Sequence, residues 1–150
     1  MTESPAPPYV DDLEVGDRGP SRSLVLTRTD LVRYAGASGD FNPMHHDETM
    51  ALAAGMPSVF GHGMLSAGFL AGAVTDFVGL GTLTRFRVRF TKQAWPDRTL
   101  TTEVEVRALD PDSDGANVEL DCRVVDDHGS VILTGHAAAR LPRRTEKAAT

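Results

Sequence analysis

Cysteine is nearly absent from this chain, since Cys122 is the only one among 150 residues. A single thiol excludes an intramolecular disulfide and a paired-cysteine metal site, and it fits a reducing, cytoplasmic location. A basic excess is absent too, because the formal charge is −6 at pH 7. Phosphate binding needs a basic face, so this charge argues against general nucleic-acid binding.

Long apolar runs are also scarce. Residues 1–17 are acidic and proline-rich, with neither a basic nor an apolar leader segment, so no signal peptide is expected. Residues 63–81 are the most apolar stretch, but Asp76 interrupts them and the uninterrupted part is too short for a membrane span. A helix buried against a sheet explains this stretch better.

The remaining composition, 41% hydrophobic and 24% charged, is that of one ordinary globular domain. Residues 21–28 predict a strand, and the apolar spacing in residues 29–39 predicts a helix. Asp47 can cap a short helix that stops at Gly55, and a long apolar helix is expected from Gly63.

From Leu83 onward, apolar and polar residues alternate with the period of a strand. The four expected strands span residues 83–91, 100–109, 116–126 and 130–141. We therefore expect an α+β fold in which an antiparallel sheet wraps around one central helix. The domain is expected over residues 19–142, between a loosely ordered arm (1–18) and a flexible tail (143–150). An open sheet edge would favour a dimer.

Reactive side chains are concentrated in SGDFNPMHHDE, residues 38–48. Pro43 restricts its own backbone and that of Asn42, so the segment between Asp40 and His45 has a defined shape. The Asp40 and His45 side chains could converge as an acid and a base, with Asn42 orienting a water or the local backbone. A purely structural interpretation stays open at this point, because Asp, Asn and Pro are also ordinary turn formers.

A metal interpretation of the adjacent His45 and His46 has less support. Neighbouring residues point in different directions, and the chain has neither an H-x-x-x-H nor an H-x-x-E-H pattern. No metal site is therefore expected.

The stretch FGHGML, residues 60–65, places Gly63 where the long helix is expected to begin. Helix N-termini offer unpaired N–H groups and a partial positive charge, and a glycine there lets a ligand approach the backbone. The Gly63 N–H could thus bind a developing oxyanion. The alternative is that Gly61 and Gly63 only form a tight turn and that His62 packs or caps locally.

These two stretches resemble the MaoC-like hydratases and dehydratases, the (R)-specific enoyl-thioester hydratase group with the hot-dog fold. The family motif, aspartate-x-Asn-Pro-x-His, stands here as GDFNPMH, and the family's HGM at the start of the central helix stands at residues 62–64. YAGASGD before the motif and VRFTKQAWP after the helix also match, and the likeness covers about residues 10–142. Within the family, the chain resembles the catalytic B-type subunits of actinobacterial (3R)-hydroxyacyl-carrier-protein dehydratases.

The resemblance implies that Asp40 and His45 form a catalytic acid–base dyad, that Asn42 supports this dyad, and that the Gly63 N–H polarises a thioester carbonyl. A serine that some members use to hold the aspartate is replaced here by Ala71. Substrate contacts are expected at four further positions: His62, Met64, Arg89 and Lys92. The basic side chains Arg89 and Lys92 could bind the phosphates of the substrate. For most of the arginines in residues 85–89, a simpler expectation is a solvent-exposed strand face or pairing with Glu103 and Glu105 on a neighbouring strand.

The implied activity is the reversible hydration of trans-2-enoyl thioesters to (3R)-3-hydroxyacyl thioesters. No cofactor is expected, because CoA or the phosphopantetheine of an acyl-carrier protein enters as part of the substrate. A homodimer is expected, with a heterodimer containing another hot-dog subunit as the alternative. Two other functions stay open: a hot-dog acyl-thioesterase, and a subunit that needs a partner chain for activity.

Overall fold

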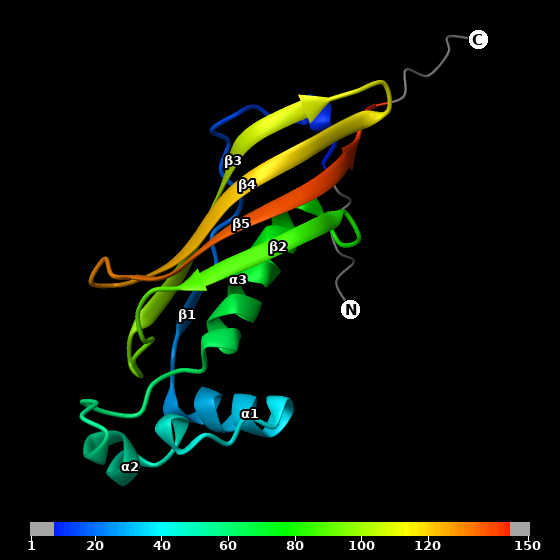
Figure 1. Ribbon diagram of the computed structural model, residues 1–150. Coiled ribbons are helices and arrows are strands. Elements are labelled where there is room, and N and C mark those ends of the chain that lie inside the picture. Colours follow the sequence, from blue (N-terminus) through cyan, green and yellow to red (C-terminus); the bar gives the residue numbers. More distant parts are fainter. Residues whose placement is uncertain (1–7, 145–150) are drawn as a thin grey trace.

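A computed structural model describes residues 8–144 and shows one sheet, one long helix against it and two shorter helices at one end (Figure 1). The helices are α1 (Arg28–Ser38), α2 (Glu48–Ala53) and α3 (Gly63–Val78). The strands are β1 (Ser23–Val25), β2 (Leu83–Phe90), β3 (Thr99–Pro111), β4 (Gly115–Asp126) and β5 (Val131–Pro142). Two 3-10 turns, η1 (Val10–Asp12) and η2 (Pro43–His45), complete the elements.

The sheet has the strand order β1-β3-β4-β5-β2, and all neighbouring strands are antiparallel. Helix α3 contacts β2, β3, β4 and β5, and its buried residues, including Leu70 and Val74, pack with apolar residues of the strands. Alternate residues of β3 such as Val104 and Val106 are buried while Glu103 is exposed, as the period of two predicts. The predicted α+β fold, an antiparallel sheet around a central helix, is confirmed.

Side-chain caps set the starts of two helices, and the one at Asp47 was predicted. Thr27 and Asp30 form a capping box at the start of α1, and Asp47 caps α2 by accepting a hydrogen bond from the Met50 N–H. The first strand is shorter than residues 21–28, because Thr27 is used as the cap of α1. Within residues 8–144, none of the helices combines the length and hydrophobicity that a membrane crossing requires.

A loosely ordered arm was expected over residues 1–18. Its described part, residues 8–18, is attached to the domain. Val10 is buried in the core, and the Gly16 N–H donates to the Val106 carbonyl at 2.8 Å. Arg144, from the expected tail, forms an ion pair with Asp12 at 2.6 Å. Residues 8–18 therefore lie along β3 more closely than a loose arm would, whereas residues 1–7 and 145–150 lie outside the described part.

The strand order corrects one predicted set of ion pairs. Pairing of the β2 arginines with Glu103 and Glu105 was one of two expectations, beside a solvated strand face, and both glutamates lie on β3. Strand β2 instead pairs with β5, and Arg85 reaches across to Glu119 on β4 at 2.8 Å. Glu103 pairs with Arg123 at 2.7 Å. The reason is topological, because two strands separate β2 from β3 in the sheet.

Candidate active site

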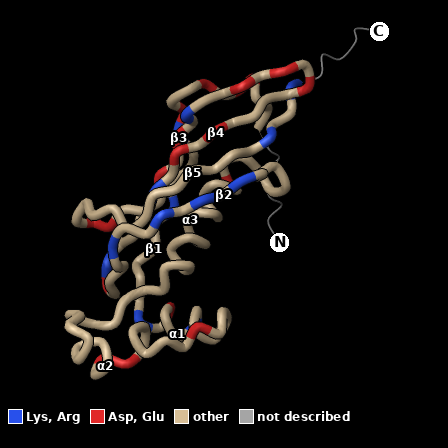
Figure 2. Tube along the Cα trace, in the orientation of Figure 1, with Lys and Arg blue, Asp and Glu red and all other residues tan. Residues whose placement is uncertain are grey.

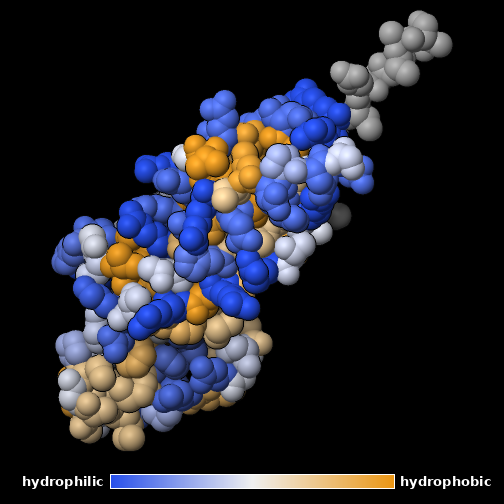
Figure 3. All heavy atoms as spheres, turned by 45° about the horizontal axis from the view of Figure 1, so that its top comes forward, coloured by the Kyte–Doolittle hydropathy of each residue, from blue (hydrophilic) through white to orange (hydrophobic). Residues whose placement is uncertain are grey.

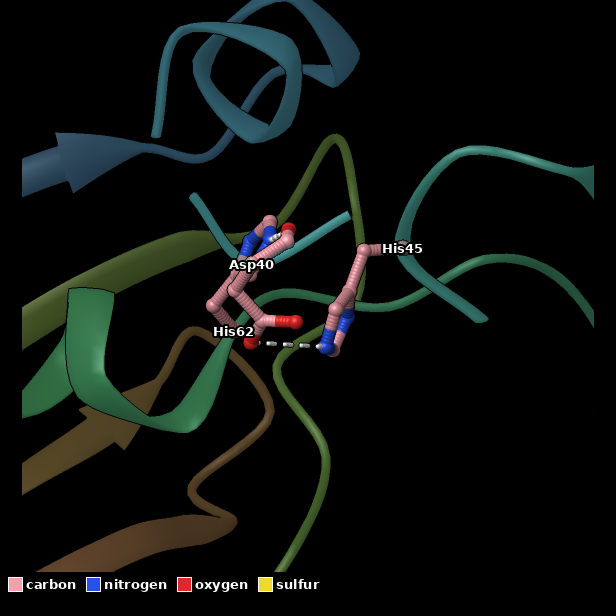
Figure 4. Close-up of side chains that lie close together, drawn as sticks. All are labelled: Asp40, His45 and His62. Carbon is pink, nitrogen blue, oxygen red and sulfur yellow. Dashed lines mark hydrogen bonds and ion pairs between the residues drawn. The ribbon is translucent and has the colours of Figure 1, made fainter. Parts of the chain in front are cut away.

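The loop after α1 brings Asp40 and His45 together. Gly39 ends α1 in the left-handed conformation, with φ 75°, which lets the chain reverse without a steric penalty. The Asn42 side-chain oxygen then accepts the Met44 N–H at 3.1 Å, and Pro43 opens the 3-10 turn η2. Asp40 and His45 consequently point toward each other, with 3.9 Å between Asp40 Oδ2 and His45 Nε2 (Figure 4).

Hydrogen bonding assigns the protons of His45. Its Nδ1 lies 2.7 Å from the carbonyl oxygen of Phe60, which can only accept, so Nδ1 carries the hydrogen. In the neutral ring Nε2 is then the free acceptor, and this is the atom that faces Asp40. The His45 side chain is 10% exposed and that of Asp40 is 51% exposed, so the dyad opens to solvent on the aspartate side.

The Asn42 side chain acts on the loop, whereas the Asn42 backbone N–H contacts the acid of the dyad. Its side-chain oxygen is used by the Met44 N–H, and its own N–H donates to Asp40 Oδ1 at 3.2 Å. The amide thus holds the turn that separates the two reactive side chains. Ala71 lies in α3 and carries no side-chain hydrogen-bond donor.

Gly63 is the first residue of α3, where backbone N–H groups have no acceptor within the helix. Its φ is not in the left-handed region, so the glycine is required for space rather than for its backbone angle. A first side-chain atom at Gly63 would lie 3.1 Å from Cε1 of Phe90. A cavity of about 270 Å³ opens here, lined by residues that include Gly63, Ser66, Phe90 and Lys92.

The four expected substrate contacts lie in different surroundings. Met64 is 60% exposed beside Gly63 at the helix start, and Lys92 lines the cavity at the end of β2. Arg89 lies on the exposed side of β2, opposite Thr134 of β5. His62, by contrast, is only 1% exposed and lies behind the dyad, where its ring stacks on that of His45.

Asp40, His45 and His62 place possible metal-ligand atoms within 4.8 Å of one another. The two imidazole rings, however, stack at 3.9 Å between centroids with 30° between their planes. A metal ion lies in the plane of each imidazole that binds it, and two stacked rings do not direct their nitrogen lone pairs to one point. The geometry therefore suits acid–base chemistry better than a metal centre.

A larger hollow of about 760 Å³ lies over β3, β4 and β5, and no residue of the dyad or of the Gly63 turn lines it. Its charged side chains largely pair with one another, as Arg123 does with Glu103 and His136 with Asp121. Cys122 also lines it, but burial raises the pKa of this thiol to about 12, which leaves it unreactive at neutral pH.

Two features of the site have no signal in the sequence. The Phe60 carbonyl that fixes the His45 tautomer is a backbone group, which every residue type provides. The stack of His62 on His45 joins segments 17 residues apart, and only the fold brings them together. The neighbouring HG dipeptide marked His62 as notable, but it suggested contact with substrate rather than with the dyad.

Comparisons with known proteins agree with this geometry. The MaoC like domain model matches residues 15–126. The chain is 29% identical to an (R)-specific enoyl-CoA hydratase of Rhodospirillum rubrum over 138 residues, covering 91% of this chain and 93% of that protein. It is 30% identical to an (R)-specific enoyl-CoA hydratase of Aeromonas caviae, covering 87% of this chain and 96% of the relative.

Solved structures show the same fold. The (R)-hydratase from A. caviae involved in PHA biosynthesis superposes with a TM-score of 0.78 at 29% identity, covering 87% of this chain and 98% of the other. The unliganded R-hydratase PhaJ1 from Pseudomonas aeruginosa gives a TM-score of 0.77 at 28% identity, covering 95% and 92%. These relatives are hydratases, and enzymes that add or remove water in this way are hydro-lyases. The chain is a hydro-lyase of the MaoC-like family, with the hot-dog fold of that family.

Proposed function

We propose that this enzyme hydrates trans-2-enoyl thioesters to (3R)-3-hydroxyacyl thioesters, or catalyses the reverse dehydration, with an Asp40–His45 dyad and the Gly63 N–H. The observation that carries the proposal is the 3.9 Å separation of Asp40 Oδ2 and His45 Nε2. This distance is too long for a direct hydrogen bond and suits two acceptors that share one water. The (R)-specific hydratases among the relatives support the substrate class and the stereochemistry.

The mechanism follows from where each group lies. The thioester carbonyl binds at the start of α3, where the Gly63 N–H stabilises the negative charge that develops on its oxygen. The dyad takes a proton from the shared water as the water oxygen bonds to the β-carbon, and the protonated dyad then returns that proton to the α-carbon, so that H and OH are both added and the dyad is restored. Because the oxyanion forms only as the reaction proceeds, the N–H favours the transition state over the bound substrate.

This proposal is tested by expressing the chain alone and adding crotonyl-CoA or longer enoyl-CoAs. The absorbance of the enoyl thioester should fall as water is added to its double bond. Chromatography of the product against (3R) and (3S) standards establishes the configuration. Release of free thiol from a saturated acyl-CoA, measured in parallel, would instead favour the thioesterase. Activity that appears only after a second hot-dog chain is added would favour a subunit that needs a partner.

We further propose that the basic side of β2 binds the phosphates of the substrate. Figure 2 shows the positive charges gathered along this strand. Arg85 already pairs with Glu119, whereas Arg89 has no acidic partner in the part of the chain that the structure describes. Lys92 lines the cavity next to Gly63, so this end of β2 is near the place where the thioester would bind.

Arg89→Gln and Lys92→Gln are each expected to raise KM for an enoyl-CoA by about twofold to fivefold, the size of one exposed ion pair, with kcat unchanged. The same variants should leave KM unaltered for an enoyl N-acetylcysteamine thioester, which carries no phosphate. Arg85→Gln is the matched control, because its charge is already used by Glu119. Equal effects of all three variants on both substrates would contradict phosphate binding.

We also propose a homodimer. On the face shown in Figure 3, apolar groups form separate patches among hydrophilic ones. Around the site, Phe41 (64% exposed), Met64 (60%) and Phe90 (49%) remain uncovered in a single chain, and β2 is a free edge of the sheet. Light scattering should give twice the 16.1 kDa chain mass. If the chain is monomeric by itself and associates only with a different hot-dog subunit, the result would support the heterodimer instead.

Catalysis is expected to need no metal ion. The stacking of His45 and His62 leaves the three nearby side chains poorly arranged as ligands. Dialysis against EDTA should therefore leave turnover unchanged. Loss of turnover, with recovery on adding zinc, would overturn this expectation.

A further inference from the structure

His62 is almost fully buried and lies against the dyad. It immediately precedes α3 as its N-cap residue, yet its side chain makes no capping hydrogen bond. The residue is 1% exposed, so its ring is covered by protein on all sides. Figure 4 shows this ring beside Asp40, next to the backbone carbonyl of that residue.

The His62 ring contacts both members of the dyad. Its Nε2 lies 3.0 Å from the backbone carbonyl oxygen of Asp40, and because a carbonyl only accepts, Nε2 carries the hydrogen. Its face stacks on the His45 ring with 3.9 Å between centroids. One side chain therefore holds the backbone of the acid and the ring plane of the base, which lie five residues apart in the loop.

Other contacts complete this arrangement. The edge of Phe60 contacts the His45 ring at 5.2 Å between centroids, and Tyr34 packs against His62 at 4.9 Å. His62 Nδ1 is buried without a hydrogen-bond partner, so a proton there would be an unsatisfied buried charge. Burial accordingly lowers the pKa of His62, and the ring next to His45 stays neutral.

We propose that His62 is the positioning residue of the dyad, fixing Asp40 and His45 relative to each other through one hydrogen bond and one ring stack. This inference rests on the proposed hydratase reaction. Reacting groups misplaced by about 1 Å lose about 10²-fold in rate, so a modest shift of either side chain would be costly.

Three variants separate the two contacts of His62. His62→Gln keeps an N–H for the Asp40 carbonyl and loses the stack, whereas His62→Phe keeps a stacking ring and loses the donor. Each is expected to lower kcat about tenfold, and His62→Ala about 10²-fold, with KM changed less than about twofold. A raised KM with normal kcat would mean that His62 contacts the substrate, which would overturn the proposal.

A double-mutant cycle gives the decisive measurement. If His62 acts by setting Asp40 and His45 relative to each other, then His62→Ala should lower the residual rate of the His45→Gln enzyme far less than the about 10²-fold it costs the unmodified enzyme, because one of the two groups it positions is already gone. Equal losses in both backgrounds would show a general structural role and overturn the proposal, as would loss of the folded circular dichroism spectrum in all three His62 variants. Failure of the hydratase proposal would be recognised separately, by an inactive wild-type enzyme.

Discussion

Asp40→Asn and His45→Gln should each reduce hydration of an enoyl thioester by about 10²-fold or more while the protein stays folded. Each substitution removes a proton acceptor that faces the 3.9 Å gap where the water is proposed to bind. A 10²-fold loss corresponds to about 2.7 kcal/mol of transition-state stabilisation. Asn at position 40 still offers an oxygen to the Asn42 N–H, so the loop should keep its shape.

The control for this prediction is the neighbouring histidine. His46 is exposed, and its Nε2 contacts the Phe41 carbonyl at 3.1 Å rather than the dyad. His46→Gln should therefore keep near-normal turnover. The rates are compared by the loss of enoyl-thioester absorbance, with circular dichroism to establish folding. Near-normal turnover in folded Asp40→Asn or His45→Gln would refute the dyad.

Gly63→Val should lower turnover by about 10²- to 10³-fold, the loss that follows removal of one oxyanion donor. The backbone N–H itself is retained, so the effect is steric. The first side-chain atom at this position would already lie 3.1 Å from the Phe90 ring, and the branched methyl groups of valine would extend into the 270 Å³ cavity. The thioester carbonyl would then be kept from the N–H at the helix start.

The choice of control glycine follows from the packing around each candidate. Gly61, two residues before Gly63, is unsuitable as a control, because a side-chain atom there would lie 3.0 Å from Leu26 Cδ2, within the core. Gly68, in the same helix as Gly63, has nothing within 4 Å of that position. Gly68→Ala should thus keep full activity and slightly stabilise the helix. Activity in Gly63→Val equal to that of Gly68→Ala would contradict the steric block.

A complex with an unreactive enoyl-thioester analogue gives the direct check of the oxyanion site. The carbonyl oxygen should lie within hydrogen-bonding distance of the Gly63 nitrogen, about 2.7–3.1 Å. If the carbonyl oxygen is bound instead by another side chain or by a second subunit, the oxyanion assignment of Gly63 is wrong. Gly63 would then only provide space for the turn.

Local features of the sequence determined the strands, the helix starts and the loop that carries Asp40 and His45. The period of two after Leu83 predicted four strands, and the structure has them as β2 to β5. Asp47 caps its helix as predicted, and Gly63 begins the long one. The spacing of Asp40, Pro43 and His45 predicted that the two reactive side chains would converge, because a proline and an Asn side chain shape so short a loop locally.

The tertiary structure decided which distant residues meet. Strand β2 neighbours β5 and not β3, so Arg85 pairs with Glu119 and the predicted pairing with Glu103 does not form. The burial of His62 against His45 was likewise decided by how the start of α3 packs beneath the loop. Periodicity and turn chemistry act over a few residues, whereas strand order and ring stacking depend on contacts between segments that only the packed core brings together.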